Sequence, residues 1–245
     1  MKPVTFALTL LTFLAPQLAY AVTCQDTEYL GNSYTVCEVD AAREDLRLFL
    51  KDDSGDVLGQ FSRVARALPE TQVLSFAMNA GMYHPDRAPV GHYVEDGQPV
   101  ARLLTGASKG NFGLLPNGVF CIRPDRADVF ETLRFEREAP DCRFATQSGP
   151  MLVIDGELHP RFLPDGTSRH VRNGVGTSDD GQRVVFAISN NRVTFHEFGS
   201  FFRDALNKPN ALFFDGKVSR LHAPQIDRSD AGFWMGPIVG VVTAD

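Results

Sequence analysis

Short apolar runs separated by polar turns dominate this chain and predict mostly β-strands. The predicted strands are Tyr34–Val39, Leu46–Leu50, Val73–Ala77, Met151–Ile154, Val184–Ile188, Asn210–Phe214 and Ile238–Val242. Two hairpins are also predicted, because glycine-containing turns separate Val90–Val94 from Pro99–Leu104 and Phe112–Leu115 from Val119–Ile122.

Only two segments have helical spacing. Phe61–Leu68 is predicted to be a helix that stops before Pro69, and Thr194–Leu206 places Phe195, Phe198, Phe202 and Leu206 on one face. Strands do not alternate with helices, which argues against a doubly wound sheet. We therefore predict an α+β domain dominated by mixed or antiparallel β-sheet, with a few flanking helices.

The first residues have the pattern of a secretory signal. Lys2 precedes an apolar stretch at 4–14, and Ala19-Tyr20-Ala21 matches a cleavage site. The stretch is too short to span a membrane. We predict a cleaved signal peptide at 1–21, a single domain at 22–245, and a periplasmic or secreted protein. The alternatives are a retained anchor and a lipoprotein attached at Cys24, although the residues before Cys24 lack a lipobox.

Charge and cysteine content narrow the function. A net charge of -6 argues against a nucleic-acid binder. Cys24, Cys37, Cys121 and Cys142 predict two disulfides in an exported chain. Of the three pairings, Cys24–Cys37 with Cys121–Cys142 needs the least chain crossing. A zinc site is the alternative, but the chain has no CxxC, HxH or HExxH pattern. No metal and no cofactor are predicted.

Four polar–glycine segments are predicted to follow strand-like runs. They are 78–81 with Asn79, 147–150 with Ser148, 172–174 with Arg172, and 215–216 with Asp215. Glycine permits a sharp turn and a close approach to a ligand. We predict that these segments converge on one pocket containing amides, a hydroxyl, a guanidinium and a carboxylate.

Each segment also has a purely structural interpretation. Asn79 is suited to hydrogen-bonding a sugar hydroxyl or phosphate oxygen, but turns also favour asparagine. Ser148 lacks the context of a nucleophile elbow, which favours binding over attack. The Arg172 fork suits a phosphodiester, and the structural alternative is a surface ion pair on an edge strand. Asp215 suits acid–base catalysis, whereas Asp-Gly is also a common hairpin turn.

Taken together and in order, several motifs resemble the phosphodiester glycosidase family. They are FAMNAGMYHPDRAPVGHYVEDG (76–97), GNFGLLPNGVFCI (110–122), ATQSGPMLVIDGELHP (145–160), RHVRNGVG (169–176), VVFAISN (184–190) and NALFFDGKVSRLHAP (210–224). The sequences of these motifs are most similar to those of a bacterial exported subgroup of these uncovering-enzyme-like domains. The resemblance covers most of the chain from about residue 76 to 224.

The resemblance implies hydrolysis of a glycosidic bond to a phosphodiester, or of a related glycosyl phosphate. It carries over onto Asn79, Gly81, Ser148, Gly149, Arg172, Asp215 and Gly216, while Ser219 occupies the serine position of the last motif. Asn173 and Lys217 complete the predicted substrate-binding set. The uncovering-enzyme branch has an Asp-Gly-Gly-Gly-Ser-like loop where this chain has Lys217-Val218, which leaves the substrate open.

The leading hypothesis is an exported hydrolase of glycosyl phosphodiesters. Arg172 and Lys217 would hold the phosphate, Asn79 and Ser148 would orient oxygens, and Asp215 would protonate the leaving oxygen or activate water. A glycosidase usually needs a second carboxylate; the candidates are Asp165, Glu95 and Asp86. The alternatives are a non-catalytic periplasmic binder of glycans or anionic envelope polymers, and a metal-dependent phosphodiesterase. The predicted partner is a sugar-phosphate or glycan; neither a membrane span nor an oligomeric state is predicted.

Overall fold

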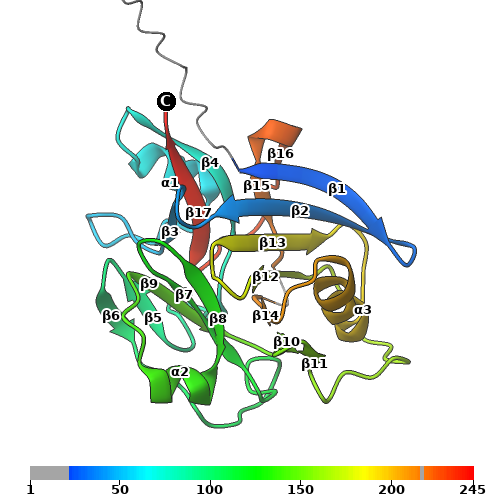
Figure 1. Ribbon diagram of the computed structural model, residues 1–245. Helices are drawn as coiled ribbons and strands as arrows, with labels where there is room; N and C mark the ends of the chain where they lie inside the picture. Colours follow the sequence, from blue (N-terminus) through cyan, green and yellow to red (C-terminus); the bar gives the residue numbers. More distant parts are fainter. Residues whose placement is uncertain (1–21, 216–217) are drawn as a thin grey trace, which may run out of the picture.

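Three antiparallel sheets organise the chain in the computed structural model, which describes residues 22–215 and 218–245 (Figure 1). The predicted signal peptide, Gly216 and Lys217 lie outside the described residues. In spatial order, the seven-stranded sheet contains β1 (Thr23–Tyr29), β2 (Asn32–Asp40), β13 (Arg183–Ser189), β12 (Asn173–Thr177), β14 (Asn210–Phe213), β10 (Met151–Ile154) and β11 (Glu157–Leu158).

The other two sheets have five strands each. One runs in the order β16 (Arg228–Ser229), β15 (Leu221–Ala223), β4 (Gln72–Asn79), β17 (Ile238–Ala244) and β3 (Asp45–Phe49). The other runs in the order β6 (Gln98–Ala101), β5 (Tyr93–Glu95), β9 (Phe144–Ser148), β7 (Gly118–Ile122) and β8 (Ala127–Glu131). The predicted α+β class, dominated by antiparallel sheet, is confirmed.

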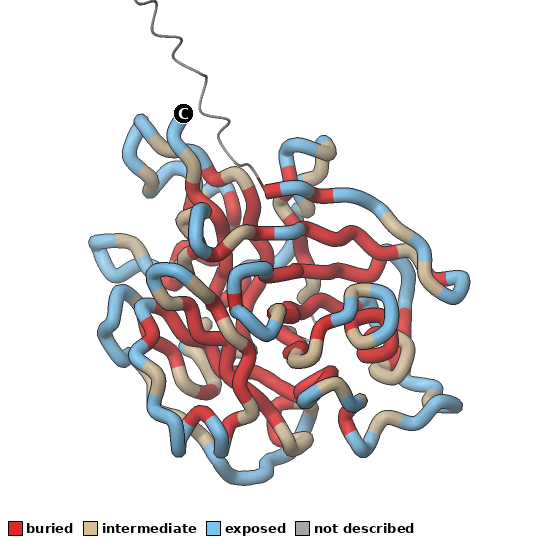
Figure 2. The backbone as a smooth tube through the Cα atoms, viewed as in Figure 1, coloured by how far each residue is buried: buried red, intermediate tan, exposed pale blue. Residues whose placement is uncertain are grey.

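The inner faces of the three sheets share one core. Phe186 from the first sheet, Phe76 from the second and Phe120 from the third meet within it; the Phe186 ring centroid lies 4.9 Å from that of Phe76 and 5.9 Å from that of Phe120. Side chains alternate along a strand, so each sheet has a second apolar face that needs its own cover. Figure 2 shows the buried strands running through the centre of the molecule.

One helix covers the outer face of each sheet. α3 (Phe195–Ser200), with the following π-helical turn Phe201–Ala205, packs on the seven-stranded sheet. α1 (Phe61–Ala67) packs against β4 and β17, and α2 (Thr132–Glu138) packs against β7 and β9. A short 3-10 turn, Pro224–Ile226, follows β15. Both predicted helices are therefore present, while α2 was not predicted.

The second predicted helix, Thr194–Leu206, lies where it was predicted, but it is an α-helix only in its first part and a π-helix in its last turn. Thr194 and Glu197 form a reciprocal capping box: the Thr194 hydroxyl accepts from the Glu197 N–H at 3.1 Å, and the Glu197 carboxylate accepts from the Thr194 N–H at 2.8 Å. The last turn widens to π geometry. Phe198 and Phe202 are fully buried, as the apolar spacing indicates.

The predicted hairpin between 112–115 and 119–122 is wrong. Residues 111–117 form a loop in which the Asn117 side chain donates to the Phe112 carbonyl at 2.9 Å. A side chain that bonds nearby main chain in this way competes with strand pairing. β7 pairs instead with β8 and β9. The hairpin of β5 with β6 is confirmed, with an irregular register at Tyr93 and Val94.

Two disulfides link residues close in sequence, Cys24 to Cys37 and Cys121 to Cys142. The local pairing predicted from the sequence is confirmed. Cys24 and Cys37 are directly opposed on β1 and β2, so the first bridge fixes the edge strand of the large sheet. Cys142 precedes β9 and Cys121 lies on β7, so the second bridge links the segment before β9 to the neighbouring strand β7.

Candidate functional site

The polar–glycine segments meet where strands from all three sheets end. Asn79 is the last residue of β4, Ser148 is the last of β9, and Asp215 follows the end of β14. Asn173 is the first residue of β12, because the strand begins after Arg172 rather than before it. β12 and β14 are antiparallel with Gly174 opposite Phe213, so the start of one lies beside the end of the other.

Three side chains form a hydrogen-bonded group that we call the amide cluster: Asn79, Asn173 and Ser219. The Asn79 Nδ2 donates to Asn173 Oδ1 at 3.3 Å, and Asn173 Nδ2 donates to the main-chain oxygen of Asn79 at 3.0 Å. Ser219 Oγ donates to Asn173 Oδ1 at 3.3 Å and lies 3.2 Å from the Val171 carbonyl. Both asparagines are fully buried. The cluster therefore joins the ends of two sheets.

The cluster extends to the chain around Asp215. Ser148 Oγ donates to the Phe214 carbonyl at 2.5 Å, and the Phe214 N–H donates to the Asn173 carbonyl at 3.1 Å. These bonds hold both main-chain polar groups of Phe214, the residue before Asp215. They fix the direction in which the strand leaves the sheet, and with it the position of the carboxylate.

Asp215 is half-buried and lies close enough to Tyr83 to affect its ionisation. Burial, and to a lesser degree the negative charge of Asp215, raise the pKa of Tyr83 to about 12. Tyr83 thus stays a neutral phenol at physiological pH. A neutral phenol and a carboxylate within electrostatic range of each other can serve as a hydrogen-bond donor and a proton acceptor for one substrate.

Gly81 and Gly149 serve close packing between sheets. A Cβ on Gly81 would lie 2.6 Å from the Gln147 carbonyl oxygen, and one on Gly149 would lie 2.6 Å from the Asn117 Cβ. Neither distance is compatible with a side chain. Gly81 therefore brings the end of β4 against β9, which places Asn79 and Ser148 in the same region. Contact of either glycine with a substrate remains a prediction.

Arg172 lies directly before β12, and its side chain points to the opposite side from that of Asn173. Its Nε donates to the Val193 carbonyl and its Nη2 to the Ser168 carbonyl, both at 3.0 Å. The guanidinium carbon lies 3.6 Å from the ring centroid of Phe195. Only 1% of the residue is exposed, and burial lowers its pKa to about 10. Arg172 thus stays cationic, and Nη1 has no hydrogen-bond partner among the described residues.

The remaining candidates lie elsewhere. Gly216 and Lys217 lie outside the described residues. Glu95 is on β5, whose register with β9 puts it beyond Ala145, at the opposite end of β9 from Ser148. Asp86 is in the exposed turn after Tyr83, and Asp165 is in the exposed turn at 163–166. Glu95 therefore does not share the site with Asp215.

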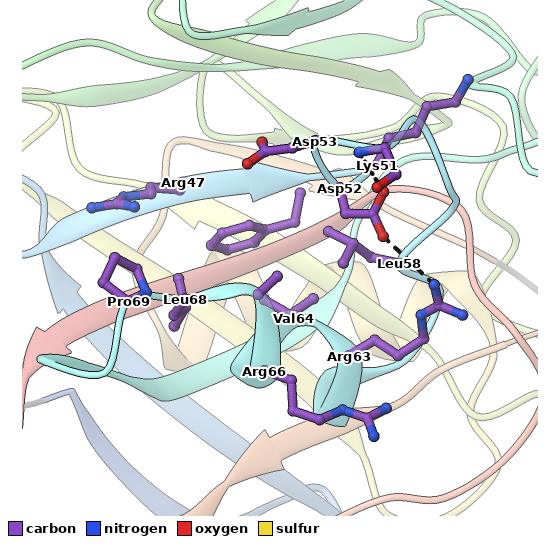
Figure 3. A pocket seen from close by; sticks show the side chains of 13 residues that line it. Arg47, Lys51, Asp52, Asp53, Leu58, Arg63, Val64, Arg66, Leu68 and Pro69 are labelled. Atoms are coloured by element: carbon purple, nitrogen blue, oxygen red, sulfur yellow. Dashed lines mark hydrogen bonds and ion pairs between the residues drawn. The ribbon is translucent and has the colours of Figure 1, made fainter.

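A surface cavity of about 530 Å³ shares no residue with the amide cluster. It lies between β3, the 52–58 turn and α1, and its rim carries Arg47, Lys51, Arg63 and Arg66 (Figure 3). Arg63 there pairs with Asp52 at 3.7 Å. Among the described residues, no group of three or more histidine, cysteine or acidic side chains is arranged to hold a metal ion.

The family model for phosphodiester glycosidases matches residues 72–222, a span that includes the amide cluster, Ser148 and Asp215. The chain belongs to the phosphodiester glycosidase family. The resemblance stated from the motifs is confirmed. The matched span contains the polar residues at the ends of β4, β9 and β14, where the three sheets meet.

Relatives extend the match over nearly the whole chain. An Escherichia coli K12 protein, uncharacterized protein YigE, is 30% identical over 224 residues, covering 91% of this chain and 85% of its own. The catalytic domain of zebrafish N-acetylglucosamine-1-phosphodiester alpha-N-acetylglucosaminidase, auto-inhibited by its pro-peptide, has a TM-score of 0.62 at 15% identity, with 90% and 81% of the two chains covered.

A putative exported protein from Burkholderia pseudomallei K96243 has a TM-score of 0.55 at 13% identity, with 86% and 74% covered. At these low identities, the structural likeness shows the fold of this phosphodiester glycosidase family member. No helix in the described part of the chain is long and apolar enough to cross a membrane.

Arg220 is a residue of the site that sequence reasoning missed. Its main-chain N–H donates to Asn79 Oδ1 at 2.8 Å, and its buried guanidinium bonds the Asp230 and Phe233 carbonyls. The sequence feature that could have pointed to Arg220 is its position directly after Ser219 in the last family-like motif. An arginine next to a polar turn suggests a surface residue, so its burial was not expected.

Proposed function

We propose that this protein is an exported hydrolase that cleaves the glycosidic bond of a glycosyl phosphodiester or related glycosyl phosphate. The observation that carries the proposal is the convergence of Asn79, Ser148, Asn173 and Ser219 around the strand end that leads into Asp215. Family membership supports the same bond type, and the pair of disulfides supports an oxidising compartment.

Asp215 is the residue we assign to the chemistry. It protonates the leaving oxygen or takes a proton from the attacking water, and a phosphodiester leaving group needs little protonation because it is already a weak base. Tyr83, kept neutral, turns its one hydroxyl proton from the Trp234 carbonyl, 3.4 Å away, to a substrate oxygen when substrate binds. Ser219, whose hydroxyl can turn from Asn173 to the substrate, and Lys217, two residues after Asp215 in the sequence, supply further polar contacts to the phosphate.

The buried amides are assigned to positioning. Asn79, Asn173 and Ser148 use their polar atoms within the protein, so they hold the chain at Phe214 rather than reach the substrate. Arg172 is assigned the same kind of role on the other face of β12, where it fixes the chain at 168 and 193. This differs from the phosphate contact expected for Arg172 from the sequence.

The test is hydrolysis of a panel of glycosyl phosphodiesters in water labelled with heavy oxygen. The sugar of the first probe is N-acetylglucosamine, as in the name of the zebrafish structure; glucosyl and mannosyl phosphodiesters complete the panel. Glycosidic cleavage puts the label on the sugar, whereas a phosphodiesterase puts it on phosphorus and loses activity with chelator. Recovery of bound, intact substrate would instead indicate a binder.

Asp215→Asn is expected to lower kcat by about a hundredfold or more, because it removes the acid–base group. Asp227→Asn is the matched control: the same chemical change at an exposed position whose left-handed backbone asparagine tolerates. Equal activity of Asp215→Asn and the wild type would overturn the assignment. Mass analysis of the exported protein, expected to begin near Val22, tests the signal peptide.

A further inference from the structure

Two consecutive large apolar side chains stand exposed in the loop between β16 and β17. Phe233 is 83% exposed and Trp234 is 42% exposed. We call residues 230–237 the aromatic loop. A single exposed apolar residue is common, but two adjacent exposed rings on one loop form a continuous apolar surface that is a candidate for binding.

The main chain of the aromatic loop is held firmly. The Arg220 guanidinium donates from Nε and Nη2 to the Asp230 carbonyl, and from Nη1 to the Phe233 carbonyl at 2.8 Å and to Gln60 Oε1 at 3.0 Å. Arg220 is itself only 6% exposed and lies over the Phe61 ring. The loop thus presents Phe233 on a fixed backbone, so little ordering entropy opposes binding.

The same contacts place the aromatic loop at the edge of the candidate site. Arg220, which anchors the loop, also bonds Asn79 through its main-chain N–H. Tyr83 Oη donates to the Trp234 carbonyl at 3.4 Å, and the Ala80 N–H donates to the Pro237 carbonyl at 2.8 Å. Tyr83 in turn lies within electrostatic reach of Asp215.

Cations accompany these rings. The Arg63 guanidinium lies 5.0 Å from the Trp234 ring centroid, and that of Arg87 lies 5.4 Å from the Tyr83 ring centroid. An apolar ring face with guanidinium groups beside it is complementary to a pyranose that carries a phosphate. The C–H face of the sugar packs on an aromatic ring, while the charge interacts with the arginines.

We infer that the aromatic loop is a sugar subsite, in which Phe233 stacks on a pyranose ring of the anionic substrate and sets the preference for it. This inference rests on the proposed function and adds to it the residue that recognises the sugar. Phe233 touches no reacting atom, so it acts on substrate affinity. Its removal raises KM and leaves kcat unchanged.

Trp234 is the only tryptophan of the chain, which provides a readout at the subsite without turnover. Titration of the wild type with the glycosyl phosphodiester panel is expected to shift or quench its emission. Phe233→Ala is expected to remove most of this response and to raise KM about five- to tenfold with kcat within twofold. The matched control is Leu133→Ala, which truncates an exposed apolar side chain on α2.

Each result decides one of the two proposals. The subsite is overturned, and the proposed function is kept, if Phe233→Ala turns over substrate with an unchanged KM and the Trp234 emission does not change on titration. No turnover, but an emission response that Phe233→Ala abolishes, overturns the hydrolase and supports the subsite. If there is neither turnover nor a change in Trp234 emission, both the hydrolase and the sugar subsite are overturned. A change from dimer to monomer in Phe233→Ala, measured by light scattering, assigns the loop to self-association and overturns the sugar subsite.

Discussion

The bond between Asn79 and Asn173 makes a quantitative prediction about how the site is held. Asn173→Ala removes the acceptor of Asn79 Nδ2 and the donor to the Asn79 carbonyl, both fully buried. A buried polar group that loses its partner costs about 1–3 kcal/mol, so two such groups predict a loss of about 2–6 kcal/mol in the free energy of unfolding. Asn79→Ala orphans the Arg220 N–H and predicts a loss of about 1–3 kcal/mol.

The double variant should lose less than the sum of the two. Once Asn79 is alanine, replacing Asn173 no longer leaves a buried Nδ2 without its acceptor, so the two changes should couple by about 1 kcal/mol. The assay is urea unfolding with disulfides intact, followed by circular dichroism and by Trp234 fluorescence, whose transitions must coincide. Losses that add within about 0.3 kcal/mol would refute the bond as a stabilising contact.

A control at the far end of the same strand separates coupling from general weakening of the sheet. Ser178 lies five residues from Asn173, roughly 16 Å along an extended chain, and donates to Asp180 in a turn. Ser178→Ala combined with Asn79→Ala should give additive losses. Coupling of the same size in this pair would mean that the asparagine cycle reports a property of the whole sheet.

Two further predictions concern packing and pH. Gly81→Ala forces a Cβ toward the Gln147 carbonyl and should cost about 2 kcal/mol and reduce activity, whereas Gly106→Ala, which has open space, should be neutral in the same urea assay. Burial raises the pKa of Glu95 from 4.5 to about 7, so the folded state binds more protons and stability should fall as pH rises through this window. Glu95→Gln should reduce this loss of stability by about 1–2 kcal/mol, a figure that allows for solvent screening. The part of the loss that is due to Glu44, whose pKa is also raised by burial, should remain. An unchanged profile of Tm against pH would contradict the Glu95 assignment.

The fold was accessible from sequence because its central strands are short apolar runs that are buried on both faces. β2 and β13 alternate between the shared core and the α3 side, and such runs are distinctive in a single sequence. β1 was missed because its side chains are mostly exposed and polar, as expected of an edge strand that faces water. The failed hairpin at 112–115 has the opposite cause, a local side-chain bond from Asn117 that no hydrophobic pattern records.

Convergence of the polar segments was predicted, but the direction of each side chain was not. Arg172 and Asn173 are adjacent in sequence and face opposite sides of the sheet, so proximity along the chain says nothing about a shared site. The segment 172–174 was predicted only to follow a strand-like run, which does not say which side chain faces which way. In the structure β12 begins at Asn173, whose amide bonds Asn79, while the Arg172 guanidinium lies over the Phe195 ring.

The burial of the amides bears on why polar residues occupy the meeting point of three sheets at all. Strands that end there leave main-chain groups, such as the Arg220 N–H and the Phe214 carbonyl, that no sheet neighbour satisfies. An apolar side chain at Asn79 or Ser148 would fill the space but leave these groups unpaired, at a cost comparable to losing a hydrogen bond each. Asparagine and serine satisfy them and also hold Phe214, the residue that leads into Asp215. The same residues that close the fold at this end are therefore the ones that set the position of Asp215, so variants in the amide cluster should alter kcat together with stability, whereas Phe233→Ala should alter KM alone.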